Sequence, residues 1–360
     1  MLPGPCALAL FFIFARVFSV FEQSEKASVP RNPPLHCPLL RDMIQGMSAL
    51  AALIAAGLLA PPKAPASHLP GLKPKLDAVA QSFQGRLGYC AIDLTTGTVI
   101  GYRHEERYPS ASTIKTVVML ELYKQVEEGK LKMTDKLEVP PVGKRNMSMW
   151  TAHLLEGTKV DLDGLTQLMM NVSDNTATVM LANHVGVENI EKRMLGWGFE
   201  NTACTINVPA TNERLVRLRK TFANMGVTSP YEMAQILKMI HEGKAASPEA
   251  CEKMIRIMSS QYWDDFIDWS VPNDVVIASK VGALQRSRSD SAIVYGPRPY
   301  IITVYTDNAK DRRWEWETEG HTAIRKIGEI LWNGMNPERP YFAKPASQKW
   351  APTGGGVEDS

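Results

Sequence analysis

A serine and a lysine three residues apart, Ser112 and Lys115, stand at the start of a helix predicted from about Thr113. A serine hydroxyl is a weak nucleophile until a base takes its proton, and a lysine amine becomes such a base when burial or nearby positive charge lowers its pKa. We expect Ser110 to cap this helix, which puts Ser112 and Lys115 on one face near the unpaired N–H groups of the first turn. The Ser-x-x-Lys spacing is common by chance and also fits an ordinary capped helix, so other segments must decide its role.

Two remote tripeptides carry residue types that suit the same chemistry. Ser173-Asp174-Asn175 separates two apolar helical runs, which predicts a helix–helix junction, although a capping serine with an Asx turn would explain it as well. Lys280-Val281-Gly282 ends a predicted strand, where a glycine lets a substrate approach the backbone closely. The similar Lys326-Ile327-Gly328 lies in the last predicted helix, where its spacing serves only the apolar stripe.

In this chain order the three motifs resemble those of the penicilloyl serine transferases, which are the class A β-lactamases and the low-molecular-mass penicillin-binding proteins. The resemblance runs from about residue 76 to 336. It implies acylation of Ser112, with Lys115 as base and Ser173 passing a proton toward the leaving nitrogen. It further implies an oxyanion hole formed by the N–H groups of residues 112 and 283, and substrate-binding residues Asn175, Lys280, Gly282 and Ala283.

The chain departs from the family pattern at two points. Val281 replaces the usual Thr or Ser, which removes a hydroxyl expected to contact a substrate carboxylate, and Arg286 or Arg288 could compensate. The Glu-x-x-Leu-Asn segment whose glutamate activates the deacylating water is missing. Glu213 lies at a comparable distance and is the remaining candidate catalytic residue, although its arginine-rich surroundings fit a surface glutamate better.

The elements that must position these residues follow from apolar periodicity. Strands are expected over 86–93 and 98–102, around 274–282, and in a hairpin that turns at 296–299, while helical patterns dominate from Thr113 to about Ser259. Helices are also expected near residues 76–83 and 321–335. The predicted fold class is therefore α/β in the α+β sense: a five-stranded antiparallel sheet covered by the N- and C-terminal helices, with an inserted all-helical lobe.

The chain divides into three expected parts. Residues 1–66 hold an apolar run, 47–60, and the small-x-small sequence Ala64-Pro65-Ala66, which indicates a signal peptide, a mis-assigned start upstream of Met43 or Met47, or an uncleaved anchor. Residues 67–336 are the expected catalytic domain, with a sheet lobe over 67–110 and 265–336 and a helical lobe over 111–264. Residues 337–360 are expected to form a disordered tail. The protein is therefore expected to work in the periplasm or as a secreted monomer, meeting the membrane only through its export signal.

Composition narrows the possible partners. A net charge of +2 and the absence of basic runs interleaved with aromatic residues predict no nucleic-acid partner. The five cysteines are scattered and lack metal-ligand spacing, so no metal or cofactor is expected. A disulfide among Cys90, Cys204 and Cys251 remains open.

Three functions remain open at this point. The first is a serine β-lactamase that hydrolyses the β-lactam amide through an acyl-enzyme on Ser112. The second is a penicillin-binding or D-alanyl peptidase-like enzyme, or another serine amidase or esterase, acting on a cell-wall peptide or similar substrate with slow deacylation. The third is a catalytically silent exported binding module, which would have little reason to keep all of these residue types at matching places.

Overall fold

The computed structural model describes residues 66–144, 150–222 and 225–343. The expected leader lies outside these residues except for Ala66, as do residues 344–360 of the tail. Within the described ranges, no helix is both long enough and apolar enough to cross a membrane.

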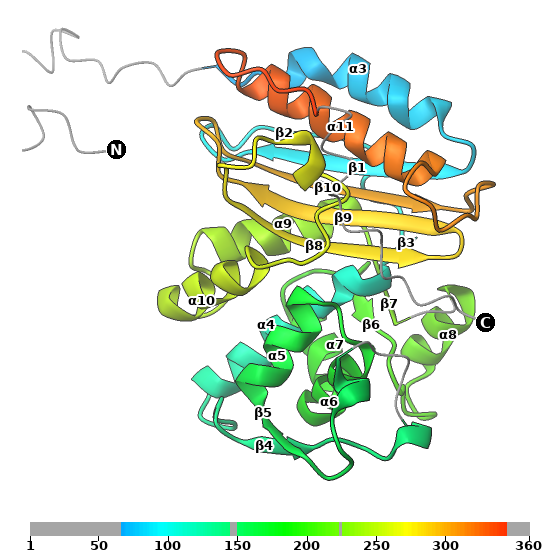
Figure 1. The fold of residues 1–360 in the computed structure, drawn as a ribbon, viewed down its shortest axis with the longest axis vertical. Helices are drawn as coiled ribbons and strands as arrows, with labels where there is room; N and C mark the ends of the chain where they lie inside the picture. The colour runs from blue at the N-terminus through cyan, green and yellow to red at the C-terminus, as the bar shows by residue number, and fades with distance from the viewer. Residues whose placement is uncertain (1–65, 145–149, 223–224, 344–360) are drawn as a thin grey trace, which may run out of the picture. The chain divides into compact units, whose positions relative to one another are not determined.

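One antiparallel sheet of five strands forms the centre of the described chain (Figure 1). Its strand order is β2-β1-β10-β9-β8, so segments from both ends of the sequence pair directly. This confirms the predicted α+β fold and the expected hairpin. The strands are β1 (Arg86–Asp93), β2 (Val99–Tyr102), β8 (Ile277–Leu284), β9 (Ser287–Val294) and β10 (Tyr300–Asp307).

Two helices from opposite ends of the chain cover one face of this sheet. α3 (Leu69–Ser82) packs against α11 (Glu319–Met335), and both contact the sheet (Figure 1). The apolar stripe of α11, which includes Ile324, Ile327 and Leu331, is fully buried in the core between helices and sheet. Burial of this stripe holds the two ends of the chain together.

The helices between the two halves of the sheet form a second core. α9 packs on β1 and β10, α10 packs on β8, and α4 lies at the centre, with Val117 to Leu122 at most 1% exposed. The apolar side chains of α4 lie on several sides of the helix, which suits a buried position, and its few buried polar groups require partners. The helices are α4 (Lys115–Glu127), α5 (Leu162–Asn171), α6 (Asn175–Val185), α7 (Val187–Gly196), α8 (Glu213–Phe222), α9 (Pro230–His241) and α10 (Pro248–Met258).

Two small sheets join the loops of this helical part. One has the order β3-β7-β6 and the other pairs β4 with β5. The first lies beside the start of α4, because β3 runs directly into it. The strands are β3 (Tyr108–Pro109), β4 (Lys136–Glu138), β5 (Lys159–Asp161), β6 (Ala203–Cys204) and β7 (Gly226–Thr228).

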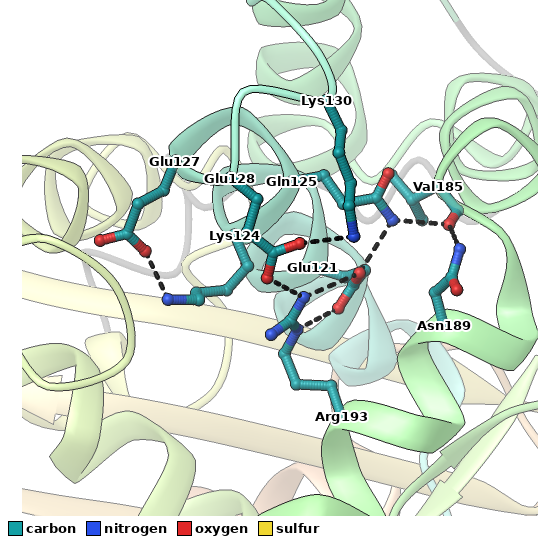
Figure 2. A network of polar contacts seen from close by, with 9 residues as sticks. All are labelled: Glu121, Lys124, Gln125, Glu127, Glu128, Lys130, Val185, Asn189 and Arg193. Carbon is teal, nitrogen blue, oxygen red and sulfur yellow. Dashed lines mark hydrogen bonds and ion pairs between the residues drawn. The ribbon is translucent and has the colours of Figure 1, made fainter.

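A polar network ties the C-terminal half of α4 to α7 (Figure 2). The carboxylate of Glu121 is 1% exposed and accepts hydrogen bonds from the Arg193 guanidinium and from Gln125 Nε2. Arg193 Nη2 also donates to Glu128 Oε1 at 2.8 Å, and Gln125 Nε2 donates to the Val185 carbonyl at 2.7 Å. The buried carboxylate is thus compensated on several sides.

Cys90, Cys204 and Cys251 are buried free thiols, so a disulfide among these three cysteines does not form. Burial raises the pKa of Cys90 and of Cys204 to about 12, which keeps both thiols protonated and unreactive.

The expected disordered tail needs correction at its start. The Trp332 Nε1–H donates to the Arg339 carbonyl, and Asn333 exchanges two hydrogen bonds with the backbone of Tyr341. Residues up to 341 therefore fold back onto α11, because side chains of that helix satisfy their backbone groups.

Candidate active site

Ser112 lies in a short 3₁₀ helix, η1 (Ala111–Ile114), that connects β3 to α4. Ser110 occupies the N-cap position of η1, as expected, but its side chain makes no capping hydrogen bond and its hydroxyl donates to the Ala111 carbonyl instead. Ala111 has a φ of +48°, a left-handed conformation that non-glycine residues adopt at a cost. The tight turn leaves Ser112 half-buried and Lys115 at the start of α4.

Gly282 lets β8 approach Ser112 closely. A Cβ atom at this position would lie 2.9 Å from the Ser112 backbone nitrogen and 2.6 Å from Ser289 Oγ, which is closer than real Cβ contacts allow. Only glycine fits here without displacing the backbone. The next residue, Ala283, is thereby held near the serine, and the N–H groups of 112 and 283 belong to the two segments that meet at this point.

Lys115 is fully buried beneath Ser112. Its Nζ donates to the Ser173 carbonyl at 2.6 Å, to Ser173 Oγ at 3.0 Å and to Asn175 Oδ1 at 2.8 Å. Burial, followed by the charge of Lys280, lowers the pKa of Lys115 well below its ordinary value, while Asp174 opposes the shift. No hydrogen bond joins Lys115 Nζ to Ser112 Oγ or to a carboxylate among the residues that the structure describes.

Asp174 holds Ser173 and Asn175 in place. Its carboxylate caps α6 by accepting from the Ala177 N–H at 2.9 Å, and it also accepts from the Thr151 N–H and hydroxyl, each at 2.9 Å. Ser173 has a φ of +59°, which turns the chain between α5 and α6. The helix–helix junction is as predicted, but the capping residue is the aspartate and the serine is free to face Lys115.

Lys280 is the second fully buried lysine. It lies opposite Ser291 in the β8–β9 register, and its Nζ donates to the Val281 carbonyl at 3.2 Å. Burial lowers the pKa of Lys280 to about 7, and the charge of Asp290 partly offsets this effect. Because strand residues alternate between faces, Lys280 and Gly282 share one face of β8 while Val281 joins the core beneath α3 and α11.

The remaining sequence candidates form no hydrogen bond to Ser112, Lys115 or Ser173 in the described part of the chain. Glu213 is the exposed first residue of α8, and within the described residues no hydrogen bond or ion pair joins it to Ser112, Lys115 or Ser173. The Arg288 guanidinium donates to the carbonyls of Leu284, Ser287 and Arg313 and stacks 4.5 Å from the Trp314 ring centroid. Arg286 is exposed in the turn between β8 and β9. Arg288 therefore does not point its guanidinium group free toward a substrate carboxylate, as its proposed compensation for Val281 would require.

Two residues at the site received no role in the sequence analysis. Asp174 was named only as part of its tripeptide, and the one signal of its capping role is its position directly before a helix. Trp150 is 47% exposed, and its backbone N–H donates to Asp174 at 3.3 Å, so an exposed indole borders the loop that carries Ser173. No periodicity or motif marks Trp150 in the sequence.

The arrangement suits acyl transfer to a serine. A neutral lysine has two N–H donors and one lone pair, so Lys115 can keep two of its three contacts and still accept a proton. The unpaired N–H groups of a helix start and a strand edge suit an oxygen that gains negative charge. In the described part of the chain, no cluster of three or more His, Cys, Asp or Glu residues could hold a metal ion.

Comparison with known proteins agrees with this geometry. The model of the "Beta-lactamase enzyme family" matches residues 71–335, and the chain therefore belongs to that family. The β-lactamase AER-1 of Aeromonas hydrophila is 26% identical over 262 residues, which cover 71% of this chain and 83% of that protein. The β-lactamase CARB-3 of Pseudomonas aeruginosa is 25% identical over 78% of this chain and 96% of its own.

Solved structures show the same fold. A β-lactamase from Sphaerobacter thermophilus DSM 20745 has a TM-score of 0.64 at 24% identity and covers 75% of this chain and 99% of its own. A mutant of PBP-A, captured as an acyl-enzyme complex with penicillin G, also has a TM-score of 0.64, at 21% identity, and covers 75% of this chain and 97% of its own. The protein is thus a β-lactamase-like hydrolase whose structural neighbours include a penicillin-binding protein.

Proposed function

We propose that the protein hydrolyses the amide of a β-lactam ring through an acyl-enzyme on Ser112. Ser112 Oγ forms a bond to the carbonyl carbon, its proton passes to Lys115 Nζ, and the C–N bond breaks as a proton reaches the nitrogen through Ser173. Water then hydrolyses the ester and restores the serine. Two aimed N–H groups, from residues 112 and 283, would each contribute about 3 kcal/mol to lowering the barrier.

Other residues of the cluster bind and orient the substrate in this proposal. Asn175 accepts from Lys115 through Oδ1, which leaves its amide N–H₂ group to donate to a substrate carbonyl. Lys280 attracts the carboxylate of the substrate when it is charged. Gly282 and Ala283 provide the open strand edge against which the substrate lies.

The observation that carries the proposal is the environment of Lys115. Its amine is fully buried, contacts Ser173 and Asn175, and has a lowered pKa without any carboxylate hydrogen-bonded to it among the described residues. A buried lysine without a carboxylate partner costs stability, so its presence one turn from a serine supports a role as base.

Repeated turnover of a chromogenic cephalosporin tests this proposal. The purified protein is expected to convert many equivalents of the cephalosporin, and Ser112→Ala is expected to convert none. Complete inactivity of the wild-type protein, with no covalent adduct, would instead support a silent binding module.

A second candidate function is penicillin binding with slow deacylation. The position of Glu213 supports it, because this carboxylate is exposed and has no hydrogen bond to Ser112, Lys115 or Ser173 among the described residues, whereas a water activator must lie within reach of the serine. A single stoichiometric burst of cephalosporin cleavage would favour this candidate. We expect Glu213→Gln to change both acylation and deacylation by less than about 2-fold, since surface substitutions have small effects. Selectively slowed deacylation would return Glu213 to the mechanism.

We also propose that the protein acts as an exported monomer. The apolar run over 47–60 and the following Ala64-Pro65-Ala66 support cleavage of a leader. The N-terminal residue of the protein purified from its native cells would decide between a cleaved leader and a retained anchor.

A further inference from the structure

Two carboxyl groups lie behind β8, on the face of the sheet that is turned away from Ser112. Asp290 of β9 is buried, and its Oδ2 accepts from the Ile267 N–H at 3.0 Å. Asp268 begins the short 3₁₀ helix η4 (Asp268–Ser270), and its Oδ2 accepts from Ser279 Oγ at 3.2 Å. The Oδ1 atoms of both residues are closed off from solvent and have no hydrogen-bond partner in the described chain.

The charged groups around this pair offer little compensation. Asp264 and Asp265, in the preceding loop, add negative charge. The nearby cations have other partners: His321 Nε2 lies 3.2 Å from Asp265 Oδ2, and Arg288 and Arg325 donate to backbone carbonyls. Lys280 is the cation whose charge acts on Asp290.

Two buried carboxyls of like charge titrate as one unit, because ionisation of the first opposes ionisation of the second. Burial raises the pKa of Asp290 to about 7 and that of Asp268 well above its ordinary range, and in Asp268 the charge of Asp290 adds to the effect. Each residue also has one carboxyl oxygen without a hydrogen-bond partner in the described chain. A proton held between the two carboxyls would give both oxygens a hydrogen bond.

We propose that Asp268 and Asp290 share one proton, and that the single negative charge left on the pair keeps the Lys280 ammonium group charged. Asp290 faces Val281 across the strand pair, one position along from Lys280, so its carboxyl lies on the opposite face of the sheet and its charge acts on Lys280 across the two strands. Both groups are buried, so water screens their attraction only weakly. Asp290 is then a positioning residue that acts through Lys280, and this role rests on the proposed function.

Few other negative charges are available to stabilise the ammonium form of Lys280. Lys115 offers no negative charge, and Asp174 accepts hydrogen bonds from the Trp150, Thr151 and Ala177 N–H groups. Without the carboxyl pair, burial would leave Lys280 neutral near pH 7, and it would attract a substrate anion less strongly. A purely structural role for the pair, such as anchoring η4 to β8, would not affect this charge.

The titration of Lys280 by ¹³C NMR of lysine-labelled protein tests the proposal directly, with Lys280→Met to assign the signal. Asp290→Asn is expected to lower the titration midpoint of Lys280 by about 1 pH unit. Asp268→Asn is expected to leave it unchanged or raise it, because the whole charge then resides on Asp290. Glu249→Gln, an exposed acid of α10, provides the matched control and should change nothing.

The outcomes separate this inference from the proposed function, because the NMR titration needs no activity. An unchanged midpoint in Asp290→Asn, or equal shifts in both aspartate variants, would overturn the shared proton and its effect on Lys280. If Asp290→Asn fails to fold, Asp268→Asn is a sufficient test. A lowered Lys280 midpoint in that variant would overturn the proposal. With an active enzyme, the alkaline limb of the acylation pH profile should move with the NMR midpoint in each variant. The expected midpoints in a protein that forms no acyl-enzyme would refute the proposed function only.

Discussion

Buried charges occur in two regions that share α4, and their compensation differs. In the C-terminal half of the helix, the Glu121 carboxylate accepts hydrogen bonds from Arg193 and Gln125, and Arg193 also donates to Glu128 (Figure 2). At its first residue, Lys115 contacts only neutral oxygens and faces a second buried lysine, Lys280.

The consequences for protonation are opposite. Contacts with Glu121 and Glu128 raise the pKa of Arg193 despite partial burial, so its charge is permanent. Burial and like charge lower the pKa of Lys115, so its amine can be neutral and basic. We infer that the compensated region stabilises the fold, while the uncompensated one costs stability and provides reactivity.

The largest expected difference between the two regions is in acylation. Lys115→Ala is expected to slow acylation by a β-lactam by at least about 10³-fold, because Ser112 loses its base. Lys115→Met should cause the same loss without lowering the urea midpoint of unfolding, since an apolar side chain suits this buried position. Stopped-flow acylation with a chromogenic cephalosporin measures the rate, and near-normal acylation would remove Lys115 from the mechanism.

The approach of β8 to the serine gives the next largest effect. Gly282→Ala is expected to slow acylation by about 10²-fold, because the added Cβ must push the strand away from the Ser112 N–H. Gly196→Ala in α7 is the control, because a Cβ there meets nothing within 4 Å. Equal acylation rates in the two variants would mean that the close approach of β8 is not needed.

Substitutions in the Glu121–Arg193 region should change the stability of the protein and not its acylation rate. Arg193→Met leaves the Glu121 carboxylate buried without its ion pair and is expected to lower the free energy of unfolding by about 2 kcal/mol, measured by urea denaturation at pH 7. The acylation rate should stay within about 2-fold. Arg256→Met breaks an exposed pair with Glu252 and should cost less than about 0.5 kcal/mol. A large loss of acylation in Arg193→Met would erase the distinction between the two regions.

A smaller effect is expected in the pH dependence of stability. The pKa of Lys280 is about 7 in the folded protein and near 10.5 in the unfolded chain, so between these values the unfolded chain binds more protons. Lys280 therefore makes the free energy of unfolding rise with pH in this window, by at most about 1.4 kcal/mol per pH unit. Lys280→Met should flatten that rise between pH 7 and 9, and an unchanged slope would mean that Lys280 titrates normally.

Periodicity in the sequence predicted most of the framework. The strand pattern of β1, which is buried along nearly its whole length, and the apolar stripe of α11 are local patterns that are visible without a structure. The junction at Ser173 could be predicted for the same reason, since apolar helical runs flank it. The 3₁₀ turn before α4 could not, because the positive φ of Ala111 depends on how η1 packs against β8, which is distant in sequence.

Long-range charge effects were beyond the sequence. Asp268 and Asp290 stand 22 positions apart and meet only because η4 packs behind the β8–β9 hairpin. Val281 was expected to change substrate contacts, yet strand alternation directs it into the core beneath α3 and α11. Which face a residue takes depends on the register of β8 against β9, and a shift of one residue would reverse every assignment.

The central claim is that Ser112 is the residue that becomes acylated. Mass spectrometry of the intact protein after mixing with penicillin, followed by peptide mapping, tests it most directly. We predict one penicilloyl group per chain on the peptide that contains Ser112, and none in Ser112→Ala. An unmodified wild-type protein, or an adduct that persists in Ser112→Ala, would contradict the account.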